Sequence, residues 1–283
     1  MPAELSAAAV LINYWNDKIS NALWISICLL IVVVINFLGA GVYGECEFWF
    51  ASIKVLTITG LIILGIIITA GGGPDHVHHG FEYWRNPGPF TQFSGITGTL
   101  GRFLGFWAVL TQAAFSYIGT EIVAIAAGEA KNPRRNIPRA IKKVYVRILV
   151  FYLCGTFVIG LLVPSSAPEL KLGTGIGKSP WVLAIRNAGI PALPSIINGC
   201  LLTSAWSAAS SDLFTSSRAL YGLALTHNAP KVFARTTARG LPYVALAISA
   251  AFGGLAYMSL SAGAGKVFNY LANLTAAAGL LTW

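Results

Sequence analysis

The stretch ISNALWISICLLIVVVINFLGAGVYG, residues 19–44, contains no Asp, Glu, Lys or Arg. A helix of about 20 apolar residues crosses the hydrocarbon core of a bilayer, and 18 or more without charge is the usual sign of a spanning helix. Further charge-free stretches follow along the chain, and all but the last reach that length: 55–74, 103–120, 148–168, 187–211, 240–265 and 267–283. The sequence predicts an all-α fold, that of a polytopic helical membrane protein.

The overall composition agrees with a chain surrounded by a lipid bilayer. Hydrophobic residues make up 55% of the 283 residues, charged residues only 10%, and the mean hydropathy is +0.69. Soluble domains carry about 25% charged residues. In a membrane protein, the net charge of +9 indicates orientation in the bilayer and not a nucleic-acid partner. The four cysteines are scattered without metal-ligand spacing, so we expect neither a metal nor an organic cofactor.

The distribution of Lys and Arg predicts which loops face the cytoplasm. We expect helices at about 1–15, 20–41, 49–70, 103–128, 141–163, 190–217, 242–260 and 266–283. If each crosses the bilayer once, the loops 42–48, 129–140 and 218–241 share one side, and with their flanking helix ends they hold 12 of the Lys and Arg residues against 7 on the other side. The richer side faces the cytoplasm by the positive-inside rule, and the loop 71–102 lies outside.

Both ends of the chain lie within apolar sequence. Residues 1–15 read as the second half of a spanning helix, and Trp283 stops inside an apolar run. We therefore expect a piece of a longer, transporter-sized chain, with residues 1–283 forming a single transmembrane transporter domain.

One acid lies near the middle of a predicted span. Glu121 follows FSYIGT, residues 115–120, in the helix expected at 103–128. An ionisable group there costs about 2.5–3.5 kcal/mol and is a functional site by default. Gly119 and its polar neighbours form a weak helical turn, and transporters interrupt helices at mid-membrane so that free backbone groups bind substrate. A continuous helix with Gly119 at a close contact and Glu121 hydrogen-bonded to a neighbour is the alternative.

Other polar features have simpler interpretations. Glu4 lies in the first helix, and Asp212 lies six residues before Arg218, close to the cytoplasmic boundary. The small-residue segment 203–211 is typical of helix packing, with hydroxyls that bond between helices. The histidines at 76, 78 and 79 have no companion Cys or carboxylate cluster, which favours a solvated loop over a metal site.

Several short motifs together resemble one known family. In chain order they are PAELSA at 2–7, YGECEFWFASIKV at 43–55, AFSYIGTE at 114–121, EAKNPRRNIP at 129–138, LTSAWSA at 202–208 and SSRALY at 216–221. In this combination and order, the chain resembles the fungal amino acid permeases of the amino acid–polyamine–organocation superfamily along nearly its whole length.

The resemblance implies a twelve-helix transporter with a five-plus-five inverted repeat, of which this chain is a partial core running from late helix 3 to helix 10. Helices 1, 2, 11 and 12 of the family are absent, and with helix 1 half of the family's substrate site. It also implies amino acid carriage by secondary-active symport with the proton as coupling ion, and a multi-pass protein of the plasma membrane.

The resemblance also implies roles for individual residues. Phe115 matches an aromatic gate over the substrate, and the unwound, substrate-binding stretch corresponds to Ser116, Tyr117, Ile118 and Gly119. Glu121 matches an acid linked to proton coupling, and Glu4 matches an acid retained in helix 3 of the family.

Two other functions remain open at this point: a membrane nutrient sensor with a permease-like pocket, and a related polyamine or choline transporter. An intramembrane enzyme is disfavoured because no nucleophile–base pair lies at helix depth, since His227 falls in a predicted cytoplasmic loop. The residues predict neither which amino acid is carried nor an oligomeric state.

Overall fold

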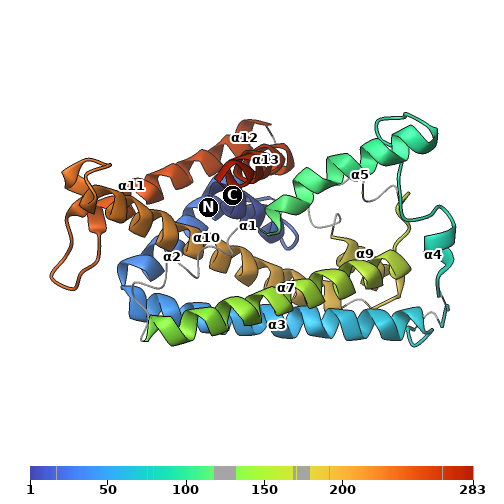
Figure 1. Cartoon of the computed structure of the whole chain (residues 1–283). Helices are drawn as coiled ribbons and strands as arrows, with labels where there is room; N and C mark the ends of the chain where they lie inside the picture. The colour runs from blue at the N-terminus through green and yellow to red at the C-terminus, as the bar shows by residue number, and fades with distance from the viewer. Residues whose placement is uncertain are drawn as a thin grey trace. The chain divides into compact units, whose positions relative to one another are not determined.

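The structure is a computed structural model. It describes residues 1–16, 18–74, 76–78, 80–117, 132–167, 170, 179–190, 192–262 and 264–282, and within these the side chains at 111, 112, 115, 261, 262, 264, 265 and 282 are not described. Every regular element of the described chain is a helix, apart from an isolated bridge between Ala70 and His78 (Figure 1). The predicted all-α class is confirmed.

The longer helices are α1 (Pro2–Ile12), α2 (Asn21–Phe37), α3 (Ala40–Thr69), α5 (Gly98–Phe115), α7 (Pro133–Leu162), α10 (Leu193–Leu225), α11 (Tyr243–Ala251) and α13 (Ala264–Thr282). Short helical segments complete the set: α4 (Glu82–Arg85), α9 (Pro180–Asn187), α12 (Ser259–Ala262) and the 3₁₀ segments η3 (Lys231–Ala234) and η4 (Phe252–Met258).

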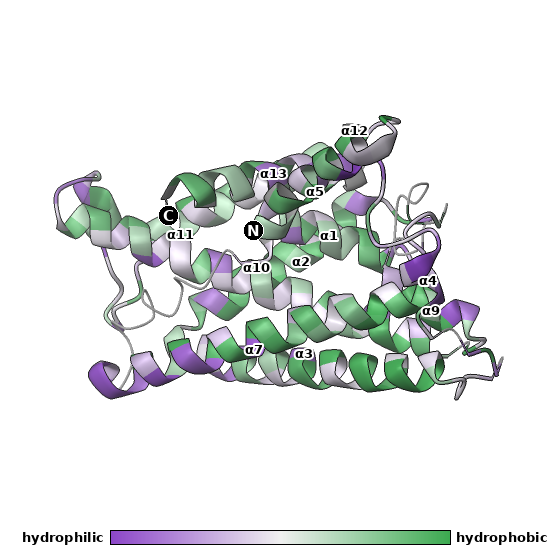
Figure 2. Cartoon of the chain, turned by 45° about the vertical axis from the view of Figure 1, so that its right-hand side comes forward, coloured by the Kyte–Doolittle hydropathy of each residue, from purple (hydrophilic) through white to green (hydrophobic). Residues whose placement is uncertain are grey.

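Two described helices, α3 and α7, are long and apolar enough to cross a membrane by length and composition alone. Each has 30 residues, which corresponds to about 45 Å at 1.5 Å per residue. Shorter apolar helices occupy Pro2–Ile12, Asn21–Phe37, Gly98–Leu110 and Tyr243–Met258. Figure 2 shows α3 hydrophobic along most of its length, whereas α7 begins with hydrophilic turns and becomes hydrophobic toward Leu162.

The expected loop at 42–48 is wrong, because these residues are helical within α3. The chain reverses earlier, where Leu38 caps α2 and Gly39 has a φ of 98°. Glycine adopts this left-handed conformation without steric penalty, so the turn needs only two residues. The acids at 45 and 47 suggested a loop by their charge, but 40–48 contains no proline, and the helix forms despite Gly41 and Gly44.

The expected loop at 129–140 is wrong for its described second half, because α7 begins at Pro133. Proline is favoured in the first turn of a helix, where its missing N–H has no partner to lose. The Arg, Lys and Ala residues that follow are strong helix formers, so the helix forms despite Pro138 inside it.

The span expected at 242–260 is helical but not uniformly α. Residues 243–251 form α11, and the chain then tightens into the 3₁₀ segment η4. The Gly253–Gly254 pair has the weakest α-helical propensity of this stretch. Gly253 is buried, and a Cβ there would meet Leu29 and Met1, so close packing also selects glycine.

The contacts divide the chain into two compact units. Unit 1 contains Met1–Lys54, Gly119–Lys143 and Leu201–Leu271. Its core joins α1, α2, α10, α11 and η4, and its fully buried side chains include Leu5, Ile25, Val32, Leu213 and Leu246. Within this unit α1 contacts α2 and η4, and α11 contacts α2.

Unit 2 contains Val55–Ile118, Val144–Cys200 and Ala272–Trp283. Its core lies where the C-terminal halves of α3 and α7 meet α9, and it is formed by Ile68, Val158, Leu162, Leu183 and Ala184. A single domain over 1–283 stays a prediction.

Gly65 sets the close approach of α3 to α7 in unit 2. A Cβ at this position would overlap with Cγ1 of Val158 and come within 3.2 Å of Cδ1 of Leu162 and Cζ3 of Trp181. We expect Gly65→Ala to destabilise the chain by about 1–3 kcal/mol, the usual cost of overpacking a filled core. Thermal unfolding of the purified protein in detergent measures the effect.

Gly60→Ala is the matched control, because Gly60 is exposed on the same helix and a Cβ there meets nothing within 4 Å. We expect this variant to unfold at or above the temperature of the parent. Equal destabilisation by the two substitutions would contradict tight packing at Gly65.

Candidate functional site

The predicted substrate-binding stretch begins where α5 ends. The backbone of Phe115 closes α5, and the N–H groups of Ser116 and Tyr117 donate to the carbonyls of Ala113 and Ala114, each at 3.0 Å. Bonds to the third preceding residue are those of a 3₁₀ turn, which commonly tightens the end of a helix. Ile118, Gly119 and Glu121 lie outside the described residues, so the predicted interruption at 116–119 and the role of Glu121 stay predictions.

Tyr152 of α7 holds the end of α5. Its hydroxyl donates to the carbonyl oxygen of Ser116 at 2.7 Å, and its ring meets that of Tyr117 edge-on at 5.4 Å and 86°. The last carbonyls of a helix lack intrahelical donors, so this hydroxyl satisfies one of them. Sequence reasoning missed Tyr152. The available signal was a phenol inside the charge-free stretch 148–168, since a tyrosine hydroxyl away from water needs a partner.

Removing this hydroxyl isolates its contribution. Tyr152→Phe keeps the ring contact with Tyr117 but leaves the Ser116 carbonyl without its donor, and we expect a loss of about 1 kcal/mol in unfolding free energy. Tyr145→Phe, at an exposed position on the same helix, is the control and should change nothing measurable. Thermal unfolding of the three proteins in detergent compares them. Indistinguishable unfolding of all three would rule out a holding role for Tyr152.

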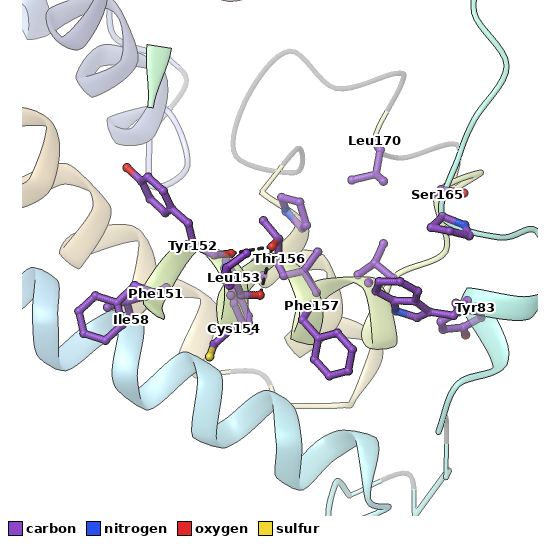
Figure 3. Close-up of a pocket in the computed structure, with 18 of the residues that line it drawn as sticks. Ile58, Tyr83, Phe151, Tyr152, Leu153, Cys154, Thr156, Phe157, Ser165 and Leu170 are labelled. Atoms are coloured by element: carbon purple, nitrogen blue, oxygen red, sulfur yellow. Dashed lines mark hydrogen bonds between the residues drawn. The ribbon is translucent and has the colours of Figure 1, made fainter. Parts of the chain in front are cut away.

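A pocket of about 1040 Å³ lies in unit 2 beside Tyr152. Figure 3 shows its lining from α7, where Tyr152, Leu153, Thr156 and Phe157 are labelled, together with Tyr83 from α4. Trp84, Phe151 and Trp181 complete the aromatic lining.

Two hydroxyl groups of this pocket, those of Thr156 and Ser165, bond to backbone carbonyls of the protein itself. Thr156 donates to the carbonyls of Tyr152 and Leu153 at 2.6 and 3.2 Å, and Ser165 donates to the carbonyl of Gly88 at 2.8 Å. No described lining residue carries a charge. An amino acid zwitterion would lose its hydration here without gaining ionic partners, so the pocket alone does not suit one.

Glu4 lies in unit 1, in the first turn of α1, with its carboxylate 16% exposed. Its Oε2 lies 2.7 Å from the Met1 ammonium, which also contacts the carboxylate of Asp212 from α10. Glu4 of α1 and Asp212 of α10 therefore lie near each other in unit 1. Any approach of Glu4 to Glu121 lies outside the described residues.

A charged triad joins α3 to α10 within unit 1. The Ser207 hydroxyl donates to the Glu47 carboxylate, at 2.8 and 2.6 Å from its two oxygens, and accepts from the Lys54 ammonium at 2.6 Å. Lys54 Nζ and Glu47 Oε1 lie 3.9 Å apart, and their side chains are 33% and 28% exposed, whereas Ser207 is fully buried. Sequence reasoning counted Lys54 as an orienting charge and missed this arrangement.

The triad continues into a polar seam along one face of α10. Asn36 of α2 donates to Ser210 Oγ at 2.9 Å, and Tyr43 of α3 donates to Ser211 Oγ at 3.1 Å. The Tyr43 ring stacks on Phe214 at 4.1 Å. Positions 207, 210, 211 and 214 follow the i, i+3, i+4, i+7 spacing of one helix face. The hydroxyls of the segment 203–211 thus bond between helices, as its composition indicated.

The histidine-containing loop shows no metal centre in its described part. His78 forms the isolated bridge with Ala70, and His79 is not described. Among the described residues, no three His, Cys, Asp or Glu side chains gather as metal ligands would.

Comparison with known proteins connects these features to a family. The family model for amino acid permeases matches residues 1–283. The chain is 47% identical to the dicarboxylic amino acid permease of Saccharomyces cerevisiae, 46% identical to the lysine-specific permease of the same yeast, and 42% identical to the proline-specific permease of Emericella nidulans. These matches cover 99–100% of this chain but only 46–52% of the relatives, so the chain spans about half their length.

The resemblance inferred from the motifs is therefore confirmed: the chain belongs to the amino acid permease family, a family of multi-pass helical membrane proteins and not of enzymes.

Proposed function

We propose that this chain forms the central part of a secondary-active carrier that moves amino acids across the plasma membrane by proton symport. The observation that carries the proposal is the family match over all 283 residues. Relatives named for dicarboxylic, basic and proline substrates match to similar extents. The proposal therefore names amino acids as the substrate class without selecting one type of side chain.

The substrate contacts follow from the end of α5. Phe115 closes over the substrate, and the backbone of Ser116, Tyr117, Ile118 and Gly119 offers it hydrogen bonds. The supporting observation is that regular α-helical bonding ends at Ser116. The N–H groups of Ser116 and Tyr117 and the carbonyl of Ser116 are bonded within the protein, so the free groups of this proposal belong to the residues after Tyr117. Half-helix ends present unpaired N–H and C=O groups, which suit the carboxylate and ammonium of an amino acid.

Coupling requires a group that gains and loses a proton at membrane depth. Glu121 is this group, with Glu4 as its companion. A carboxylate in a spanning helix destabilises insertion into the membrane, so its presence there usually marks a functional site.

Uptake by a chimera tests the proposal. The corresponding middle segment of the yeast dicarboxylic amino acid permease is replaced by this chain, and the chimera is produced in cells lacking amino acid uptake. Radiolabelled glutamate, proline and lysine cover the three side-chain classes. We expect at least one to accumulate above its external concentration and to do so less as the external pH rises.

A correctly localised chimera that accumulates none of the three would refute the transport proposal. Accumulation that does not change with external pH would support the transport proposal but refute proton coupling. Saturable binding without accumulation would instead identify a receptor with a permease-like pocket.

A further inference from the structure

The first turns of α7 carry five basic side chains that are all exposed: Arg134, Arg135, Arg139, Lys142 and Lys143. Among the described residues none of the five forms an ion pair. They belong to one continuous helix and not to a loop, so their relative positions are fixed by the helix itself.

Helical geometry gathers most of these charges on one face. At 3.6 residues per turn, Arg135, Arg139, Lys142 and Lys143 fall within an arc of about 100°. Ile137, Ala140 and Val144 lie on the opposite side of the helix, and these three are the half-buried ones. The basic face, defined here as Arg135, Arg139, Lys142 and Lys143, therefore points away from the packed side of α7.

The length of α7 sets the depth of this face. A spanning helix needs about 20 residues, which counted back from Leu162 reaches Lys143, while the charge-free stretch 148–168 begins after Arg147. The hydrocarbon boundary is therefore placed between Lys143 and Arg147. The residues from Pro133 to Lys143 then extend about 15 Å beyond it at 1.5 Å per residue. Within that length, Arg139 and Arg135 lie about 6 and 12 Å above Lys143 along the helix axis, roughly one screening length of about 8–10 Å in physiological salt.

We propose that the basic face of α7 binds the phosphate-bearing headgroup of an anionic phospholipid. Arginine forks match phosphate oxygens in a bidentate manner, and Arg135 and Arg139 present two such forks one turn apart. Orientation of the protein requires only that positive charge remains on one side of the bilayer. Orientation does not require the charges to lie on one face of a helix near the headgroups. Binding of one lipid headgroup does require this.

The test measures headgroup preference directly. The purified chain in detergent is incubated with equimolar dioleoyl phosphatidylserine and dioleoyl phosphatidylcholine, and native mass spectrometry gives the ratio of the bound lipids. We expect the parent to prefer phosphatidylserine. Arg135→Gln/Arg139→Gln/Lys143→Gln removes three of the four charges of the face and should lower the ratio of bound phosphatidylserine to phosphatidylcholine at least about fivefold, the contribution of one basic residue.

The control removes the same charges elsewhere. Lys231, Arg235 and Arg239 are also exposed, are predicted to face the same side, and comprise the same two arginines and one lysine. Lys231→Gln/Arg235→Gln/Arg239→Gln should keep the preference within about threefold. Arg135→Lys/Arg139→Lys, which keeps the charge but removes both forks, should lose part of the preference, more than the control triple and less than the basic-face triple. Circular dichroism confirms that each variant is helical.

Three results would overturn the proposal. The first is a parent without preference, and the second is an equal loss in the two charge-removed triples, which would reduce the effect to net charge. The third is full competition by millimolar inorganic phosphate, which would make the face a site for free anions and not for lipid.

Discussion

Lys54→Met should destabilise the chain more than the double variant Glu47→Gln/Lys54→Met does. The single change leaves the Glu47 carboxylate in an apolar helix with Ser207 as its one remaining partner among the described residues, whereas the double change removes both charges. Breaking one partner of a buried pair costs 3–5 kcal/mol, and replacing both is often neutral. Since these side chains are about one-third exposed, we expect about 2 kcal/mol for the single variant, with most of it recovered in the double.

Thermal unfolding in detergent of the parent, both single variants and the double variant gives the coupling energy of the pair. Glu45→Gln is the matched control, because Glu45 is an exposed acid on the same helix and forms no ion pair among the described residues. Additive losses from the two single changes would contradict a bridged pair. Ser207→Ala should weaken the same coupling, because its hydroxyl touches both charges.

The largest effect on transport is expected from Glu121→Gln in the chimera. Glutamine has nearly the shape of glutamate but cannot carry a proton, so substrate movement loses its link to the proton gradient. A carrier without coupling only equilibrates its substrate, so for proline, which has no net charge, the inside-to-outside ratio should fall to about 1, whereas charged lysine and glutamate would follow the membrane potential. Accumulation of labelled amino acid at a fixed pH gradient measures this ratio, and immunoblotting of membranes measures protein amounts.

Glu129→Gln serves as the control, because Glu129 lies only eight residues further on but in a predicted cytoplasmic segment. It should leave accumulation unchanged. Undiminished, pH-dependent accumulation by Glu121→Gln would remove Glu121 from the mechanism. Loss of accumulation with faster exchange of internal for external substrate would support it most directly, since exchange needs binding but no proton.

The helices and the family could be read from the chain because their signals are local. Most of the charge-free stretch 19–44 is helical, in α2 and the first turn of α3, because a helix satisfies the backbone bonds that a bilayer cannot. The family could likewise be recognised from the order of short motifs, which does not depend on how the helices pack. The errors arose at boundaries: 42–48 has the charges of a loop, yet the turn needed only Gly39, and the basic stretch from Pro133 was already helical.

The pairing of polar groups was beyond the sequence. Ser207 meets Lys54 and Glu47 across 153 and 160 residues, and Asn36 meets Ser210 across 174. Nothing in the local pattern selects these partners, because spacing along a helix fixes only which residues share a face. The sequence by itself determined which segments are helices in a membrane and to which family they belong. Only the tertiary structure shows that Ser207 lies between Lys54 and Glu47 and that Tyr152 bonds to the end of α5. A buried polar group needs a hydrogen-bond partner, and the packing of the helices decides which residue supplies it.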